Sequence, residues 1–212
     1  MRSPWAREYV RTQKTYIWGT EPTSFARHVA SLLSPGSRVL DLGCGEGRES
    51  VFFAAAGFDV VGVDASRAGI AKARRLAEAR GVRVHWLVGD MARLAYRGLF
   101  DLVYSCGAIH YVLRRQRTRL FPRLQSLTRP GGLHAHVVFT DQEVYVEKGE
   151  VIDYFAPGEL AEAYASWLIL HREEGRISCA QDGTPHYHSV ESFIARASAP
   201  AQTQSTQISD RE

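Results

Sequence analysis

Residues 39–50 read VLDLGCGEGRES, and this stretch decides what the rest of the chain can fold into. An apolar run carries Asp41 near its end, and glycine then occupies every second position at Gly43, Gly45 and Gly47. Glycine permits a positive φ and has no Cβ, so it allows a tight turn and a close approach of the backbone to a ligand. The polar residues that follow are typical of a helix start, whose free N–H groups would point into the turn. The stretch therefore predicts a strand, a glycine turn and a helix that together hold a ligand.

Two classes of ligand compete for such a turn. The dinucleotide fingerprint has the spacing G-x-G-x-x-G and an acid about 20 residues further on for the ribose hydroxyls. Here the spacing is G-x-G-x-G, and Asp41 comes just before it. A carboxylate at that place suits a ligand with a cation or an ammonium group better than it suits a pyrophosphate. The turn alone leaves an NAD(P)-dependent oxidoreductase open as an alternative.

Strands alternate with helices from residue 38 to residue 139. The expected strands are Arg38–Leu42, Asp59–Val63, Val82–Val88, Phe100–Ser105 and Leu133–Phe139. The expected helices are 23–33, 48–56, a helix between Ser66 and Gly81, a helix near 114–128 that begins properly at Pro122, and a short helix that starts at Pro157. Such spacing indicates βαβ units, and so an α/β fold with a doubly wound, Rossmann-like sheet that is mostly parallel. Two later strand candidates, Trp167–His171 and Tyr187–Ala195, predict an antiparallel C-terminal edge strand.

Acidic residues follow the next two strands as well. Asp64 ends the second strand, 21 positions after Gly43, and Asp90 follows the third strand directly before Met91. Open α/β sheets bind ligands at the carboxyl ends of their strands, near the point where the strand order reverses. We therefore expect these acids to lie beside the glycine turn.

With these motifs the chain resembles the class I S-adenosylmethionine (SAM)-dependent methyltransferases over roughly residues 10–197. The resemblance implies that Asp64 binds both ribose hydroxyls, that Asp90 recognises the adenine amino group, and that Met91 backs the adenine ring. The cofactor-binding residues that we expect are Tyr16, Trp18, Asp41, Gly43, Cys44, Gly45, Arg48, Asp64, Ala65, Asp90, Met91, Ser105 and Cys106. The implied activity is in-line transfer of a methyl group from SAM to the S, Se, Te, O or N atom of a small molecule.

A nearer similarity is to the tellurite-resistance and thiopurine-type methyltransferases. It rests on GEGRES at 45–50, YIWG at 16–19, GFDV at 57–60 and FIAR at 193–196. The chain departs from the tellurite group at Ser178-Cys179, where that group carries a His-Arg pair.

Four residues are candidates for the acceptor side. His110 and Tyr111 follow the fourth strand, and His110 either moves a proton or only shapes the pocket. His186 and His188 are two apart, so on a strand they face the same side. They could be a metal pair, a pair that orients the acceptor, or an ordinary strand surface, and no metal is assigned to the chain.

The N-terminal aromatic residues Tyr16 and Trp18 either cover a hydrophobic edge or close over the cofactor. We expect residues 1–35 to be the lid and helix region of one methyltransferase domain, 1–197, and residues 198–212 to be a disordered tail.

Composition narrows the partners. The 212 residues carry a net charge of +3, and the arginines are scattered, which does not indicate a nucleic-acid partner. Residues 105–108 also lack the [DN]-P-P-[YFW] motif of base methylases, which disfavours the alternative of a nucleic-acid or protein methyltransferase. Three cysteines without a C-x-x-C pair, no apolar leader and no spanning run predict a cytoplasmic protein, away from membranes. We expect a monomer or homodimer whose partner is a small-molecule acceptor.

Overall fold

The computed structural model describes residues 5–93, 98–146 and 152–198, so the expected tail lies outside the described residues from 199 onward. The strands are β1 (Arg38–Leu42), β2 (Asp59–Asp64), β3 (His85–Val88), β4 (Phe100–Cys106), β5 (Thr128–Phe139), β6 (Leu168–Cys179) and β7 (His186–Arg196). The α-helices are α1 (Trp5–Arg11), α2 (Ser24–Ser31), α3 (Arg48–Ala55), α4 (Arg67–Ala79), α5 (Arg114–Ser126) and α6 (Glu159–Ala163). Two short 3₁₀ helices, η1 (Met91–Arg93) and η2 (Ile109–Tyr111), follow β3 and β4.

All seven of these strands form one sheet in the order β3-β2-β1-β4-β5-β7-β6. Neighbouring strands are parallel from β3 to β5, while β7 runs antiparallel to both β5 and β6. The strand order reverses at β1, so the carboxyl ends of β1 and β4 diverge there and leave room for a ligand. The predicted doubly wound α/β class is confirmed, and the reversed strand β7 lies one place in from the edge.

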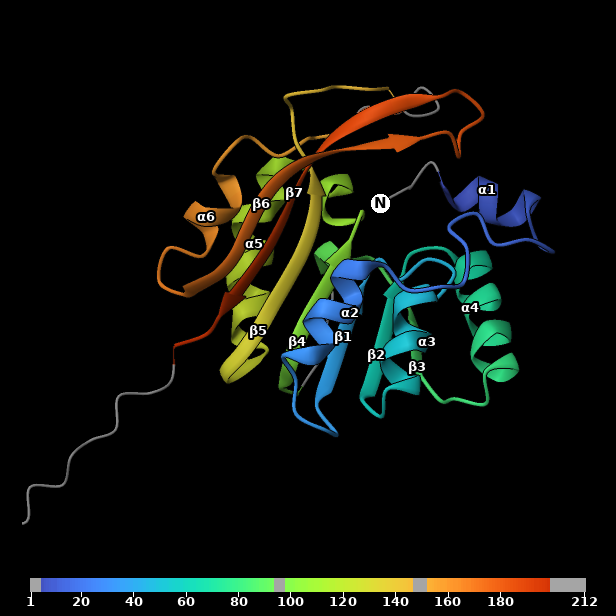
Figure 1. Ribbon diagram of the computed structural model, residues 1–212, viewed down its shortest axis with the longest axis horizontal. Coiled ribbons are helices and arrows are strands. Elements are labelled where there is room, and N and C mark those ends of the chain that lie inside the picture. Colours follow the sequence, from blue (N-terminus) through green and yellow to red (C-terminus); the bar gives the residue numbers. More distant parts are fainter. Residues whose placement is uncertain (1–4, 94–97, 147–151, 199–212) are drawn as a thin grey trace, which may run out of the picture.

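Helices cover both faces of the sheet (Figure 1). Alternation along β1 shows the two layers, because Val39 packs with α2 and α3 on one face while Leu40 and Leu42 pack with α5 and α6 on the other. The helix α4 packs against α3 through a smaller cluster that contains Val51 and Leu76. The tip of the β6–β7 hairpin reaches over the carboxyl ends of the parallel strands (Figure 1). This arrangement places the glycine turn, the ends of β2 and β4, and the hairpin around one space.

Several elements differ from their expected bounds: β3 begins at His85 and β5 at Thr128, and the largest differences are in α5 and β6. The helix α5 begins at Arg114 and contains Pro122, although proline was expected near its first turn. Proline removes one helical hydrogen bond, but Leu120, Phe121 and Leu124 are buried in the core, and this burial favours the continuous helix. The strand β6 continues to Cys179 because its backbone pairs with β7 along its length. Its length was not expected because most of its residues are exposed and its polar and apolar residues do not alternate.

A polar network of aromatic residues is buried beneath α5. The Tyr164 hydroxyl lies 2.6 Å from His134 Nδ1 and 2.8 Å from His136 Nε2, and the Thr128 hydroxyl lies 2.7 Å from His134 Nε2. Both histidines are fully buried. Burial lowers the pKa of His136 to about 3 and that of His134 well below its usual range, so both rings are neutral in the folded protein at neutral pH.

These neutral rings predict a loss of stability in mild acid. His136 has a lower pKa in the folded chain than in the unfolded chain, so its contribution is present above about pH 6.5 and is lost as the pH falls toward 3. Between pH 7 and pH 5 this loss is about 2 kcal/mol of unfolding free energy.

Urea unfolding of the wild type and of His136→Gln at several pH values measures this loss of unfolding free energy. The difference in unfolding free energy between the two proteins should shift by about 2 kcal/mol against the wild type from pH 7 to pH 5. It should stay constant between pH 7 and pH 8, where the unfolded histidine is already neutral. A constant difference across the whole range would contradict the burial argument.

Candidate active site

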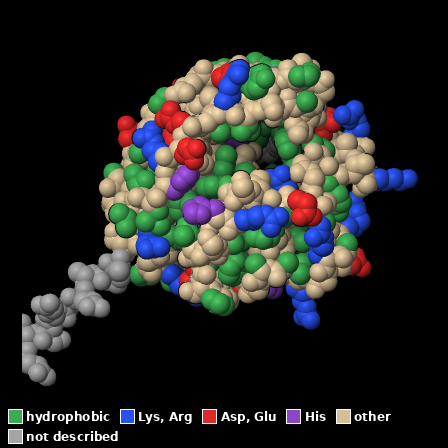
Figure 2. All heavy atoms as spheres, viewed as in Figure 1, with side chains coloured by type: hydrophobic (Ala, Val, Ile, Leu, Met, Phe, Trp, Pro, Cys, Tyr) green, Lys and Arg blue, Asp and Glu red, His purple; other side chains and the backbone are tan. Residues whose placement is uncertain are grey.

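A cavity of about 320 Å³ lies at the carboxyl ends of β1, β2 and β4, which is large enough for a small-molecule ligand. In Figure 2 a hollow opens between α1 and the β6–β7 hairpin, with hydrophobic side chains along its walls. Nine of the expected cofactor-binding residues line this central cavity: Trp18, Gly43, Cys44, Gly45, Arg48, Asp64, Ala65, Met91 and Cys106. The sequence-based expectation and the cavity therefore coincide at the glycine turn.

The glycine turn is fastened to the end of β2. The N–H groups of Gly43 and Cys44 both donate to the Val63 carbonyl, at 2.8 and 3.1 Å. Gly43 and Gly45 have φ values of +70° and +51°, which favour glycine. A Cβ on Gly43 would lie 2.2 Å from the Cβ of Ala108, so the absence of a side chain here is needed by the protein's own packing.

Asp64 ends β2 on the cavity wall. One carboxyl oxygen accepts the Gly45 N–H at 2.9 Å and the other accepts the Ser66 N–H at 2.7 Å. Burial raises the pKa of this carboxyl from its ordinary value, while the two N–H donors lower it. Each oxygen keeps acceptor capacity toward the cavity, since a carboxylate has about four lone-pair sites.

Asp41 lies beneath the turn and is almost fully buried. Its carboxyl accepts a hydrogen bond from the Ser50 hydroxyl at 2.5 Å, which ties β1 to the first turn of α3. Burial raises the pKa of Asp41 to about 7. A positive charge brought into the cavity would favour the ionised form of this group.

The N-terminal segment, residues 5–22, closes one side of the cavity. Trp5 and Tyr9 line it together with Trp18. The Trp5 and Trp18 rings meet edge to face at 4.6 Å, and the Trp5 indole N–H donates to the Tyr111 hydroxyl at 2.7 Å. The segment is thus connected, through Trp5 of α1, to Tyr111 in the 3₁₀ helix that follows β4.

A buried ion pair holds the N-terminal segment in place. Glu46 in the glycine turn pairs with Lys72 of α4, and both side chains are 1% exposed. Lys72 also donates to the Thr12 carbonyl at 2.8 Å, and Glu46 accepts the Trp18 N–H at 3.3 Å. The Tyr9 and Tyr16 rings lie 5.7 and 5.5 Å from the same ammonium. One charge pair therefore links the glycine turn, α4 and the N-terminal segment.

On the acceptor side, η2 carries Tyr111 on the cavity wall and His110 behind it. His110 is fully buried and stacks on Phe139 at 4.1 Å, and the Phe139 N–H donates to its Nδ1 at 3.4 Å. Burial, and then the charge of Arg117, holds the pKa of His110 well below its usual range. His110 shapes the wall from behind, and a role in proton transfer stays a prediction.

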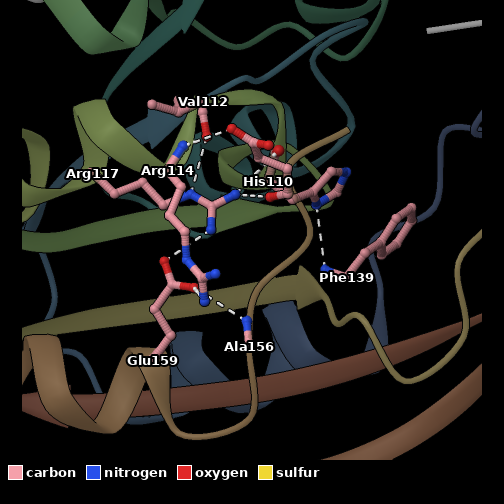
Figure 3. Close-up of polar contacts among 8 residues, drawn as sticks. His110, Val112, Arg114, Arg117, Phe139, Ala156 and Glu159 are labelled. Atoms are coloured by element: carbon pink, nitrogen blue, oxygen red, sulfur yellow. Dashed lines mark hydrogen bonds and ion pairs between the residues drawn. The ribbon is translucent and has the colours of Figure 1, made fainter. Parts of the chain in front are cut away.

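Arg117 holds η2 in position (Figure 3). Its side chain is 2% exposed, and it donates to the Val112 carbonyl at 3.0 Å, to the His110 carbonyl at 3.4 Å and to Glu159 at 2.9 Å. Glu159 in turn accepts the Ala156 N–H at 3.1 Å, so α6 is tied to the same centre.

The remaining predicted residues do not line the cavity. Tyr16 packs on the α3–α4 cluster, Asp90 accepts the Ala92 N–H at 2.9 Å, and Ser105 is buried in β4. His186 and His188 lie on β7, with Nε2 atoms 2.9 Å apart. Their roles stay predictions.

Four residues that shape the site were missed by the sequence analysis: Trp5, Tyr9, Lys72 and Arg117. Each contacts residues that are distant in the sequence. Lys72 and Arg117 also have other basic residues close to them in the sequence, and no nearby residue indicates that their side chains are buried. The aromatic character of Trp5 and Tyr9 was the one available signal. In the described part of the chain, none of the helices has the length and apolar character needed to cross a bilayer.

Residues 39–132, from β1 into β5, match a family model described as "Methyltransferase domain". The chain is 28% identical over 155 residues to Hemagglutinin 1 of Eikenella corrodens, covering 73% of this chain and 51% of that protein. It is 32% identical over 135 residues to an uncharacterized methyltransferase of Synechocystis, covering 63% and 62%.

TehB of Haemophilus influenzae is similar in both sequence and structure. The chain is 26% identical over 145 residues to this "probable S-adenosyl-L-methionine-dependent methyltransferase", covering 68% of this chain and 50% of that protein. The crystal structure of TehB matches with a TM-score of 0.74 at 22% identity, over 91% of this chain and 65% of that chain. The chain thus spans about half to three fifths of the length of these curated relatives.

The Glu46–Lys72 pair predicts a large effect of one substitution. Lys72→Met leaves the Glu46 carboxylate buried without its cation, which should cost about 3 kcal/mol of unfolding free energy. The N-terminal segment should also become more accessible, so limited trypsin digestion should cut sooner within residues 5–22.

Arg74→Met is the matched control. Arg74 lies exposed on the same helix, so its loss should cost less than about 1 kcal/mol. Equal stability and equal digestion of the two variants would show that the buried pair does not hold the segment.

Proposed function

We propose that the chain carries a class I SAM-dependent methyltransferase domain, similar to the tellurite-resistance type, and that it methylates a small molecule held in the central cavity. The single observation that carries the proposal is the cavity itself, which brings the glycine turn, Asp64 and Met91 together beside an acceptor wall containing Tyr111. The acceptor atom is S, Se, Te, O or N.

The residues present fit SAM on two structural grounds. Two acids at this end of the sheet, the buried Asp41 and the partly buried Asp64, are held by neutral O–H and N–H donors. Their negative potential suits a ligand with a sulfonium and an ammonium group. Asp64 keeps acceptor capacity toward the cavity, as a clamp on two ribose hydroxyls requires.

These same acids argue against the alternative of a nicotinamide dinucleotide. A pyrophosphate would face the Asp64 carboxyl on the cavity wall, with Asp41 beneath the turn, which is unfavourable for like charges. Isothermal titration with SAM and with NAD separates the two functions. Binding of NAD without binding of SAM would replace the methyltransferase proposal.

SAM supplies an activated methyl group, so the chain has to align the acceptor and exclude water. Alignment falls to the rigid wall formed by η2, which Arg117 holds from behind. Exclusion of water falls to the N-terminal segment, through Trp5, Tyr9 and Trp18. A thiolate or other anionic acceptor needs no general base, whereas a phenol or amine would need one.

Asp64→Asn tests the ribose clamp. Loss of the charged acceptor should weaken binding of S-adenosylhomocysteine by about tenfold to a hundredfold, the usual worth of hydrogen bonds to a charged group. Isothermal titration measures the affinity, and thermal unfolding of the same samples reports the folded state.

Asp59→Asn is the matched control. Asp59 stands at the opposite end of the same strand and pairs with Arg38 at 3.2 Å on the surface. Its substitution should leave the affinity unchanged. An Asp64→Asn variant that binds as tightly as this control would remove Asp64 from the proposed site.

A further inference from the structure

Three metal-ligating side chains meet at the tip of the β6–β7 hairpin. They are Cys179, His186 and His188, and one potential ligand atom from each lies within 4.8 Å of the other two. Cys179 pairs directly with His186 across the hairpin, and His188 pairs with Ile177 two residues away. Residues two apart on a strand share a face, so the hairpin register itself places the three side chains together.

The environment of His186 orients one ring nitrogen toward the other two groups. Its Nδ1 lies 2.6 Å from the Thr184 carbonyl, which can only accept, so Nδ1 carries the proton. In the neutral ring Nε2 then carries the lone pair, and it faces His188 Nε2 at 2.9 Å. The Asp182 carboxyl lies 3.6 Å from the same Nδ1. Metal-binding histidines are commonly held in this way, by a carbonyl or carboxylate on the nitrogen away from the ion.

Aromatic rings fix both histidines in place. His188 is fully buried and stacks on Phe139 at 4.0 Å, while His186 stacks on Tyr145 at 3.5 Å. The Tyr145 hydroxyl donates to Asp182 at 2.6 Å, so the group behind His186 is held as well. Fixed rings lose little freedom when they bind an ion, which favours binding.

The third group, Cys179, lies on the wall of the central cavity. Its thiol donates to the Gln181 side-chain carbonyl at 2.9 Å, and a rotation of this side chain would turn the sulfur toward the histidines. Around a tetrahedral zinc ion, with Zn–S of about 2.3 Å and Zn–N of about 2.0 Å, the ligand atoms lie roughly 3.3 to 3.5 Å apart. The sulfur therefore needs to approach the histidines by about one ångström, while the two Nε2 atoms, now 2.9 Å apart, need to separate slightly.

We propose that Cys179, His186 and His188 form a binding site for a zinc-class divalent ion beside the central cavity, which Cys179 lines. One thiolate and two imidazoles are the donor set that zinc prefers, and three protein ligands leave a coordination position open. Binding displaces the Cys179 thiol proton, and the proton between the two Nε2 atoms moves to Nδ1 of His188, so that both rings bind the ion as neutral imidazoles. A methyl acceptor could bind the ion at this open position, and that step rests on the proposed function. The ion site itself does not rest on it.

Metal titration of the full chain, without an affinity tag, tests the site. The wild type should bind one Zn²⁺ per chain at micromolar concentration, and Co²⁺ in its place should give a sulfur-to-cobalt charge-transfer band. Cys179→Ser should lose that band, and His186→Ala and His188→Ala should each weaken Zn²⁺ binding at least tenfold. His85→Ala, an exposed histidine on β3, should bind as the wild type does.

A second measurement needs no substitution. Zn²⁺ should protect Cys179 from alkylation by iodoacetamide, as read by mass spectrometry of the labelled peptide. Absence of stoichiometric Zn²⁺ binding, unchanged affinity in both histidine variants, or equal alkylation with and without Zn²⁺ would each overturn the site.

Titration of S-adenosylhomocysteine into the same samples separates the two proposals. Zn²⁺ binding without S-adenosylhomocysteine binding supports the ion site and contradicts the methyltransferase proposal. The reverse result contradicts the ion site alone.

Discussion

Three hydrogen bonds between the glycine turn and the end of β2 are the constraint on which the rest of the structure depends. Gly43 and Cys44 donate to the Val63 carbonyl, and Gly45 donates to Asp64. These bonds join the carboxyl ends of two neighbouring parallel strands into one rigid edge. The bond from Gly45 also partly compensates the desolvation of the Asp64 carboxyl, since an unpaired buried charge would be costly. The cavity, the N-terminal segment and the acceptor wall are all arranged around this edge.

This edge could be predicted from the sequence because its causes are local. The strand at residues 38–42, the positive φ of the glycines and the acids at the strand ends lie within a short stretch of chain. The alternation of strands and helices then indicates the sheet order through general rules of connection. The long strand β6 could not be predicted, because its middle residues are polar and exposed and it exists only by pairing with β7.

The walls of the cavity depend on contacts between distant residues. Trp5 meets Tyr111 across 106 positions, and Lys72 meets Thr12 across 60. A single sequence contains no pattern that indicates which distant residues are in contact. It also does not distinguish a buried lysine in an amphipathic helix from a lysine on the solvent-exposed face. The sequence therefore predicted the residues that line the cavity at the glycine turn far better than those of the N-terminal segment or of η2. His186 and His188 form an intermediate case, because their spacing predicts a shared face while the approach of Cys179 needs the hairpin register.

The outer strand β6 has one further consequence, for self-association. Its two ends carry exposed apolar side chains, including Leu168 and Ile177, and an exposed apolar border strand can recruit a second chain by backbone pairing. Its middle carries the charged residues 172–174, which form ion pairs with neighbouring side chains on the same sheet. If β6 of a second molecule paired with this strand, its charged side chains would be brought close to these charges. The contact would be repulsive or would require the charged groups to lose bound water. The charged centre thus acts as a gatekeeper against aggregation along this border of the molecule.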